Sequence, residues 1–238
     1  MKKKETSKPI YLQLREIIRN KIEEGEYMPG TAIPSENKLS EIYGINRITT
    51  RNAVEALVNE GLLRRVQGKG VFVVGNKNIV SIEEQNGFIN DIKDSRAYVK
   101  ETKKIIRPAG NKYATIFNID VDDEIYFINQ IHYIGDDVCS VQELYITKDI
   151  LPSLDTINTS VFSFKDIMSF YGIKLIKTTQ TLKIIEGDKK SKKMLNVPYS
   201  VAIMVLECNY YGEKNNIIAQ SINYIRSDIQ SFTVNLHK

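Results

Sequence analysis

Three short amphipathic segments and a glycine-rich hairpin signal fill the first 75 residues, and this pattern admits few folds for that part of the chain. Residues 9–24 carry apolar side chains at the spacing of one helical face, and a Pro-Gly turn follows them. Ser35 is placed to cap a second helix that Gly44 closes, and Asn46 to cap a third that runs to about residue 59. Two short helices joined by a tight turn predict a helix-turn-helix.

The start of the third predicted helix is polar and basic, whereas its apolar residues lie in its second half. Arg47 and Arg51 are one helical turn apart and project from the same side. A recognition helix enters the major groove with its N-terminal residues, where arginine binds guanine with two hydrogen bonds. The pattern predicts a DNA-reading helix, with ordinary solvent-exposed arginines as the alternative.

A β-hairpin is predicted directly after this helix. Leu62–Val66 and Val71–Val74 are strand-like runs, and Gln67-Gly68-Lys69-Gly70 separates them. The glycines allow the backbone to approach a duplex closely, and Lys69 can reach a phosphate. The hairpin is therefore interpreted as the wing of a winged helix.

Charge and composition agree with a DNA-binding segment and exclude other classes of protein. Residues 1–75 contain 13 Lys or Arg and 9 Glu, whereas residues 76–238 contain 20 basic and 20 acidic residues. The longest apolar run, Val201–Leu206, is far shorter than the roughly 18 residues of a membrane span. Cys139 and Cys208 lack metal-ligand spacing and are expected to be reduced core residues of a cytoplasmic protein.

Residues 8–74 resemble the GntR family of bacterial winged-helix transcription regulators. The resemblance rests on ordered elements that include Pro9-Ile10-Tyr11, Pro29-Gly30, Pro34-Ser35-Glu36, Arg47, Thr49, Arg51, Gly61-Leu62, Gln67-Gly68-Lys69-Gly70 and Phe72-Val73. It implies that DNA is contacted by Ser35, Glu36, Asn37, Asn46, Arg47, Thr49, Arg51, Gln67, Gly68, Lys69 and Gly70. Asn37 and Asn46 replace the arginine and serine common in the family, so an unusual half-site preference is expected.

The remaining chain predicts an α+β domain with a mainly antiparallel sheet, after a linker at residues 76–85. Helices are expected near residues 112–117, 160–171 and 189–195. Strand-like runs occupy residues 98–107, 125–134, 138–146, 175–185, 201–211 and 217–225. The lysine run at residues 189–193 is interpreted as a solvated helix face, with a nucleic-acid patch as the alternative. The sequence contains no nucleophile elbow, Walker loop or metal motif, so neither catalytic residues nor a metal site is expected.

Residues 86–238 resemble the UTRA effector-binding domain that follows the winged helix in the histidine-utilisation repressor subfamily of GntR proteins. The shared marks are Gly87-Phe88, Glu143 after a hairpin, Ser160-Val161-Phe162, Tyr171-Gly172, Leu195-Asn196-Val197-Pro198, Ser221 and Tyr224. The resemblance implies a chorismate-lyase-like fold, a small-molecule effector and pairing into dimers. The candidate effector-binding residues are Gly87, Phe88, Gln130, His132, Glu143, Ser160, Phe162 and Tyr224.

The ligand expected for this pocket is polar. Gln130 and His132 stand where many phosphosugar-binding members carry two arginines, and alternate strand residues share a face. A bound phosphate would therefore need a protonated His132 together with backbone N–H groups at Ser160, which is predicted to begin a helix. His132 packed inside the sheet is the alternative to ligand contact.

These features together predict a cytoplasmic, homodimeric transcription regulator, expected to be a repressor, that binds a pseudo-palindromic DNA operator. A metabolite, with a sugar or sugar phosphate expected first, modulates that binding, and no cofactor or membrane partner is expected. Two alternatives stay open: a chorismate-lyase-like enzyme fused to a DNA-binding module, and a second domain that serves only as a dimerisation scaffold.

Overall fold

The computed structural model describes residues 9–75 and 96–229 of the chain, so the predicted linker at 76–85 lies outside the described residues. The chain divides into two compact units. The first unit comprises residues 1–79 together with residues 157–172, and the second comprises residues 80–156 and 173–238. Each unit is described by itself below.

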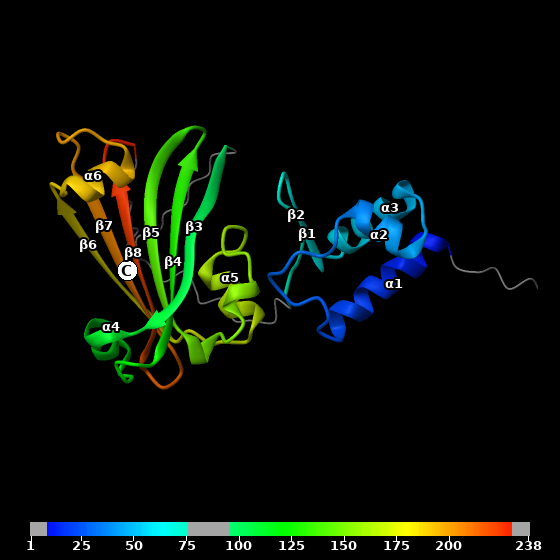
Figure 1. Cartoon of the computed structure of the whole chain (residues 1–238), viewed down its shortest axis with the longest axis horizontal. Helices are drawn as coiled ribbons and strands as arrows, with labels where there is room; N and C mark the ends of the chain where they lie inside the picture. The colour runs from blue at the N-terminus through cyan, green and yellow to red at the C-terminus, as the bar shows by residue number, and fades with distance from the viewer. Residues whose placement is uncertain (1–8, 76–95, 230–238) are drawn as a thin grey trace, which may run out of the picture. The chain divides into compact units, whose positions relative to one another are not determined.

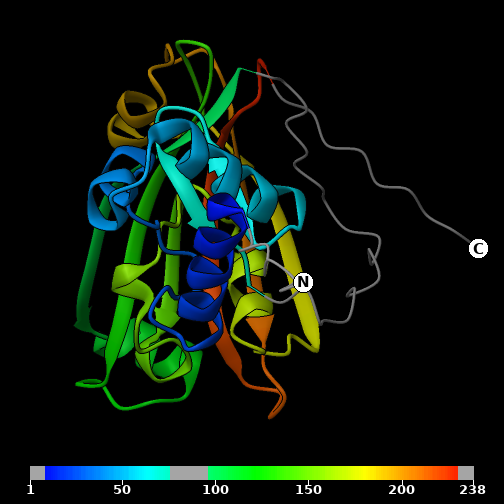
Figure 2. The same cartoon turned by 90° about the vertical axis from the view of Figure 1, so that its right-hand side faces the viewer.

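The first unit contains the predicted helix-turn-helix and hairpin, which confirms the winged-helix fold (Figures 1 and 2). Its elements are α1 (Ile10–Glu23), α2 (Glu36–Tyr43), α3 (Arg47–Asn59), β1 (Leu63–Val66) and β2 (Gly70–Val73). The Ser35 hydroxyl accepts a hydrogen bond from the Lys38 N–H at 3.2 Å, and Gly44 closes α2 in the left-handed conformation at φ 63°. Both helix ends therefore form where the sequence predicted them.

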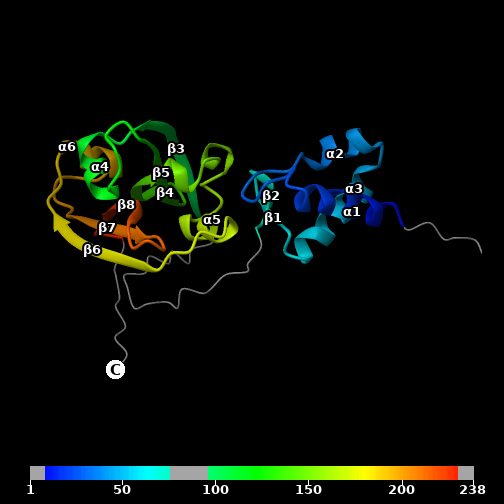
Figure 3. The same cartoon turned by 90° about the horizontal axis from the view of Figure 1, so that it is seen from below.

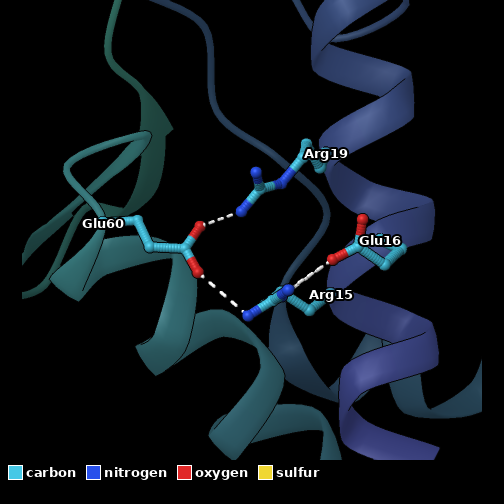
Figure 4. Close-up of polar contacts among 4 residues, drawn as sticks. All are labelled: Arg15, Glu16, Arg19 and Glu60. Atoms are coloured by element: carbon cyan, nitrogen blue, oxygen red, sulfur yellow. Dashed lines mark hydrogen bonds and ion pairs between the residues drawn. The ribbon is translucent and has the colours of Figure 1, made fainter. Parts of the chain in front are cut away.

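A compact core and an ion-pair cluster hold the three helices of this unit together. Leu14, Leu39 and Leu57, one from each helix, are all 0% exposed. At the end of α3 the Glu60 carboxylate pairs with Arg15, at 3.2 Å, and with Arg19 (Figure 4). Because Arg15 and Arg19 are one turn apart on α1, the cluster fixes α1 against the end of the recognition helix.

Residues 157–172 form the remaining part of the first unit and include α5 (Phe164–Phe170). The prediction that this helix starts at Ser160 is wrong, because Ser163 is its N-cap. The Ser163 hydroxyl accepts from the Asp166 N–H at 3.1 Å, and Asp166 accepts in return from the Ser163 N–H at 3.0 Å. This capping box supplies partners to the first N–H groups of α5, so Ser160 lies in a turn before the helix.

The second unit is built on a six-stranded antiparallel sheet, which confirms the predicted mainly antiparallel sheet (Figure 1). The strand order is β3-β4-β5-β8-β7-β6. Its strands are β3 (Ala97–Pro108), β4 (Glu124–Ile134), β5 (Asp137–Thr147), β6 (Lys177–Ile185), β7 (Ile203–Tyr211) and β8 (Ile217–Arg226). Two short 3₁₀ turns, η1 (Lys148–Ile150) and η2 (Leu154–Thr156), follow β5. Cys139 and Cys208 are buried and form no disulfide with each other, as expected of reduced core residues.

Two helices, α4 (Gly110–Phe117) and α6 (Lys189–Leu195), cover one face of this sheet (Figure 3). Tyr113 and Phe117 of α4 pack with Ile125 and Tyr145, and Leu195 of α6 packs with Val141. The helices are thus segregated on one side, as in the predicted α+β class.

The lysine run on α6 is not the fully solvated face that its charge predicted. Lys192 is only 3% exposed, and its ammonium donates to the carbonyl oxygens of Tyr199 and Val201. A buried ammonium requires such acceptors, and the loop after α6 supplies them.

Candidate nucleic-acid interface and ligand cavity

The recognition helix α3 separates a buried side from an exposed side. Its buried residues are Thr50, Ala53, Val54 and Leu57. Arg47, Arg51 and Asn52 are exposed, and Thr49 is half-buried. The first turn is fixed by Asn46, whose side-chain oxygen accepts from the Thr49 N–H at 2.8 Å. The exposed side therefore presents two guanidinium groups from a helix start of defined geometry, as major-groove reading requires.

Other predicted DNA contacts already have structural roles in the first unit. The Ser35 and Asn46 side chains cap α2 and α3. The Glu36 carboxylate pairs with Arg65 of β1 at 2.7 Å, and Arg65 also lies 3.4 Å from Glu55. These bonds connect α2 and α3 to the wing, while Asn37 stays exposed beside them.

The four wing residues Gln67, Gly68, Lys69 and Gly70 are exposed at the tip of the hairpin. Gly68 and Gly70 have φ values of 71° and 121°, which only glycine adopts readily. The Lys69 ammonium donates to the Ser160 hydroxyl at 3.0 Å and to the Ser160 carbonyl oxygen at 3.3 Å. Partial burial lowers the pKa of Lys69 from its ordinary value. Lys69, a predicted DNA contact, is therefore hydrogen-bonded to Ser160, a predicted effector contact.

Phe162 anchors residues 157–172 on the winged helix. Its ring is 2% exposed and meets Phe72 and Phe170 edge-to-face, with centroids 6.2 and 5.0 Å away. The Arg64 guanidinium lies 5.7 Å from the same ring. These contacts bury the Phe162 ring, so it packs within the first unit and was not brought to a ligand cavity as the sequence predicted.

Two hydrogen bonds to main-chain carbonyl oxygens attach the same segment to the turn after α1. The Asn158 N–H donates to the Gly30 carbonyl oxygen at 3.1 Å, and the Tyr171 hydroxyl donates to the Pro29 carbonyl oxygen at 2.9 Å. Segment 157–172 is therefore bound at both of its ends, and by Phe162 between them.

A cavity of about 410 Å³ in the second unit brings together Glu143 and Tyr224, two of the predicted effector residues. Its lining residues are Glu143, Ile185, Gly187, Asp188, Lys190, Ser191, Met194 and Tyr224. Those from residues 185–194 were not predicted, because only the packing of α6 against the sheet brings them to Glu143. The sequence signal was Asp188, which caps α6 by accepting from the Ser191 N–H at 2.8 Å.

Carboxylates and a phenol dominate the polar chemistry of this cavity. The Glu143 carboxylate accepts from the Tyr145 hydroxyl at 3.0 Å. Burial, followed by the nearby Glu143 carboxylate, raises the pKa of Tyr224, and hydrogen bonds from Ser191 lower the pKa of Asp188. Tyr224 therefore stays a neutral donor and acceptor while Asp188 stays ionised, an arrangement that favours hydroxyl or ammonium groups as ligands.

Gln130 and His132 project from the face of the sheet opposite Glu143. Gln130 is opposite Gln142 and His132 is opposite Ser140 in the β4–β5 pairing, whereas Glu143 is opposite Asn129. Paired residues share a face and neighbours alternate, so these two side chains stay together but do not reach the cavity. Burial lowers the pKa of His132, so it is neutral near pH 7 and supplies no cation for a phosphate.

The other predicted effector residues lie elsewhere. Ser160 and Phe162 belong to the first unit, and Gly87 and Phe88 lie outside the described residues. Within residues 9–75 and 96–229, no group of three or more histidine, cysteine, aspartate or glutamate side chains could hold a metal ion. None of the helices in the same ranges is long and apolar enough to span a membrane.

A winged helix joined to an α+β unit with a ligand-sized cavity defines a DNA-binding transcription regulator modulated by a small molecule. Residues 10–73 match the gntR family of bacterial regulatory proteins, and residues 101–230 match the UTRA domain. The chain therefore belongs to the UTRA-domain proteins, and its residues 10–73 form a DNA-binding domain of the gntR type.

Similar proteins agree with this assignment. The uncharacterised HTH-type transcriptional regulator YurK of Bacillus subtilis is 27% identical over 97% of this chain and 96% of its own length. The mannosyl-D-glycerate transport/metabolism system repressor MngR of Escherichia coli is 22% identical, over 95% of each chain. The crystal structure of the possible regulator YydK from B. subtilis has the same fold, with a TM-score of 0.54 and 20% identity over 95% of this chain and 99% of that one.

Proposed function

We propose that the protein is a cytoplasmic, homodimeric repressor that binds a pseudo-palindromic operator and releases or retains it in response to an unphosphorylated, hydroxyl-rich metabolite. The single observation that carries the effector class is the cavity lined by Glu143, Asp188 and Tyr224. Its volume suits a sugar-sized ligand. Assignment to the histidine-utilisation subfamily belongs to the same proposal and rests on the sequence resemblance alone. Action by binding rather than by catalysis also belongs to it and is supported by the relatives named as transcriptional regulators.

The charge of the cavity supports a neutral or amino-bearing ligand over a phosphate ester. Among the residues that line the described cavity, Glu143 and Asp188 are acidic and Lys190 is the one basic residue. Carboxylates accept hydrogen bonds from hydroxyl and ammonium groups, whereas they repel a phosphate. His132 does not change this balance, because it is neutral and on the opposite face.

The contact between Lys69 and Ser160 supports a route from effector to DNA. A lysine ammonium that donates to Ser160 is not free to bind a phosphate with the same protons, so DNA and Ser160 compete for Lys69. We propose that segment 157–172 restrains the wing and that the effector changes the strength of this restraint. A difference of about 1 to 3 kcal/mol between the two states is typical of such coupling.

Calorimetry with matched ligands tests the effector class. A panel of hexoses, each as the neutral sugar, the amino sugar and the 6-phosphate, is titrated into wild type and Glu143→Gln. The neutral or amino form should bind best, and Glu143→Gln should lower its affinity about tenfold to a hundredfold, as loss of a charged hydrogen-bond acceptor requires.

His132→Ala is the matched control, because it alters a polar residue on the opposite face of the same sheet. It should leave ligand affinity unchanged, and Glu143→Gln should keep the wild-type melting temperature within a few degrees. Tightest binding by a 6-phosphate, with affinity insensitive to Glu143→Gln, would contradict the proposed ligand class.

A further inference from the structure

Ile48 is the most exposed large hydrophobic side chain in the described part of the chain, at 75% of its surface. It lies in the first turn of α3, between Arg47 and Thr49. An isoleucine side chain exposed to this extent forgoes most of the stabilisation that its burial would give. An exposed apolar side chain at this place therefore indicates a surface that is covered when the protein binds its target.

The helical geometry directs Ile48 straight away from the core. Leu57, which is 0% exposed, follows nine residues later, and nine residues rotate a helix through about two and a half turns. Ile48 and Leu57 thus lie on opposite sides of α3. Arg51 and Asn52, three and four residues after Ile48, are its neighbours on the exposed side, and both are exposed. An apolar side chain stands at the centre of a surface whose borders are polar and basic.

We infer that Ile48 is a specificity-determining residue that packs against the 5-methyl group of a thymine in the operator. This inference rests on α3 being the helix that enters the major groove. The thymine methyl is the apolar group that base pairs display in that groove, and an aliphatic side chain is its matching contact. The basic neighbours Arg47 and Arg51 favour DNA over an apolar protein surface as the occupant.

Removing single methyl groups from the DNA tests this contact directly. The operator is first selected from a random duplex library with the full-length protein, and each thymine of one half-site is then replaced by deoxyuridine, which lacks only the methyl. At one thymine position, wild type should lose affinity about fourfold, the value for one buried methyl-sized group. Ile48→Ala should bind the thymine and deoxyuridine duplexes equally.

Two further variants separate this contact from trivial effects. Ile48→Val keeps an apolar, β-branched side chain and should retain sensitivity to the methyl. Ile10→Ala removes another exposed isoleucine of the first unit, 58% exposed on α1, and should leave the thymine preference unchanged. Because Ile48 contributes nothing to the core, Ile48→Ala should melt no lower than wild type.

The outcomes distinguish failure of this inference from failure of the DNA-binding assignment. If Arg47→Ala abolishes operator preference but no thymine methyl matters more to wild type than to Ile48→Ala, the role of Ile48 is refuted. If Arg47→Ala leaves operator preference intact, α3 does not read bases and the assignment of the recognition helix fails with it.

Discussion

Phe162→Ala should release segment 157–172 from the winged helix. The phenylalanine ring is 2% exposed and contacts Phe72, Phe170 and Arg64. Truncation of a buried phenylalanine to alanine costs about 3 to 5 kcal/mol, part of which comes from its edge-to-face pairs at about 0.5 to 1.5 kcal/mol each. The segment supplies no residue to the core cluster of the three helices and the hairpin, so this loss should appear as local opening rather than as global unfolding.

Amide hydrogen exchange measures that opening at a single reporter. The Asn158 N–H is held by the Gly30 carbonyl oxygen at 3.1 Å and exchanges only when the segment detaches. A loss of about 3 kcal/mol should accelerate its exchange about a hundredfold. Phe162→Leu, which keeps most of the volume, should accelerate it far less.

Two results would refute this reasoning. Unchanged exchange at Asn158 in Phe162→Ala would mean that the ring does not hold the segment. Equal acceleration at the buried core amides of α1 and α3 would mean that the substitution destabilises the whole winged helix, and that segment 157–172 is not a separately detachable element.

Further predictions concern the wing and the buried histidine. Lys69→Ala should lower the slope of log affinity against log salt concentration by about one unit, as expected for one lost phosphate contact. Ser160→Ala should tighten operator binding, because it weakens the bond that competes with DNA for Lys69. Unchanged affinity in both variants at several salt concentrations would exclude the competition. Burial lowers the pKa of His132, so as the pH falls its imidazole is protonated in the unfolded chain before it is protonated in the folded one. The free energy of unfolding should therefore keep its full value above about pH 6.5 and decrease as the pH drops toward the folded-state pKa. Urea unfolding at pH 7.5 and 5.5 should show this loss in wild type and a smaller loss in His132→Gln.

The sequence predicted those parts of the fold that local chemistry determines. Ser35, Gly44 and Asn46 cap helices through bonds within three or four residues, so their spacing alone located α2 and α3. The same logic failed at Ser160, because Ser163 three residues later forms a complete capping box with Asp166 and starts the helix instead.

Long-range geometry explains what the sequence could not predict about the candidate site. Alternation predicted that Gln130 and His132 share a face, but which face depends on the register with β5, and a shift of one residue reverses it. Likewise, the approach of residues 185–194 to Glu143 depends on the docking of α6 on the sheet, which no local pattern encodes.

The order of elements along the chain links the wing to the ligand cavity. Segment 157–172 contains Phe162 and binds Lys69 through Ser160. Along the chain it is followed by β6, which ends at Ile185 on the wall of the cavity. A ligand that pulls on Gly187 and Asp188 therefore acts on a strand whose other end continues into the wing-binding segment. Under this reasoning, cavity variants should alter the effector response without changing operator affinity in its absence, and Ser160 variants should change both.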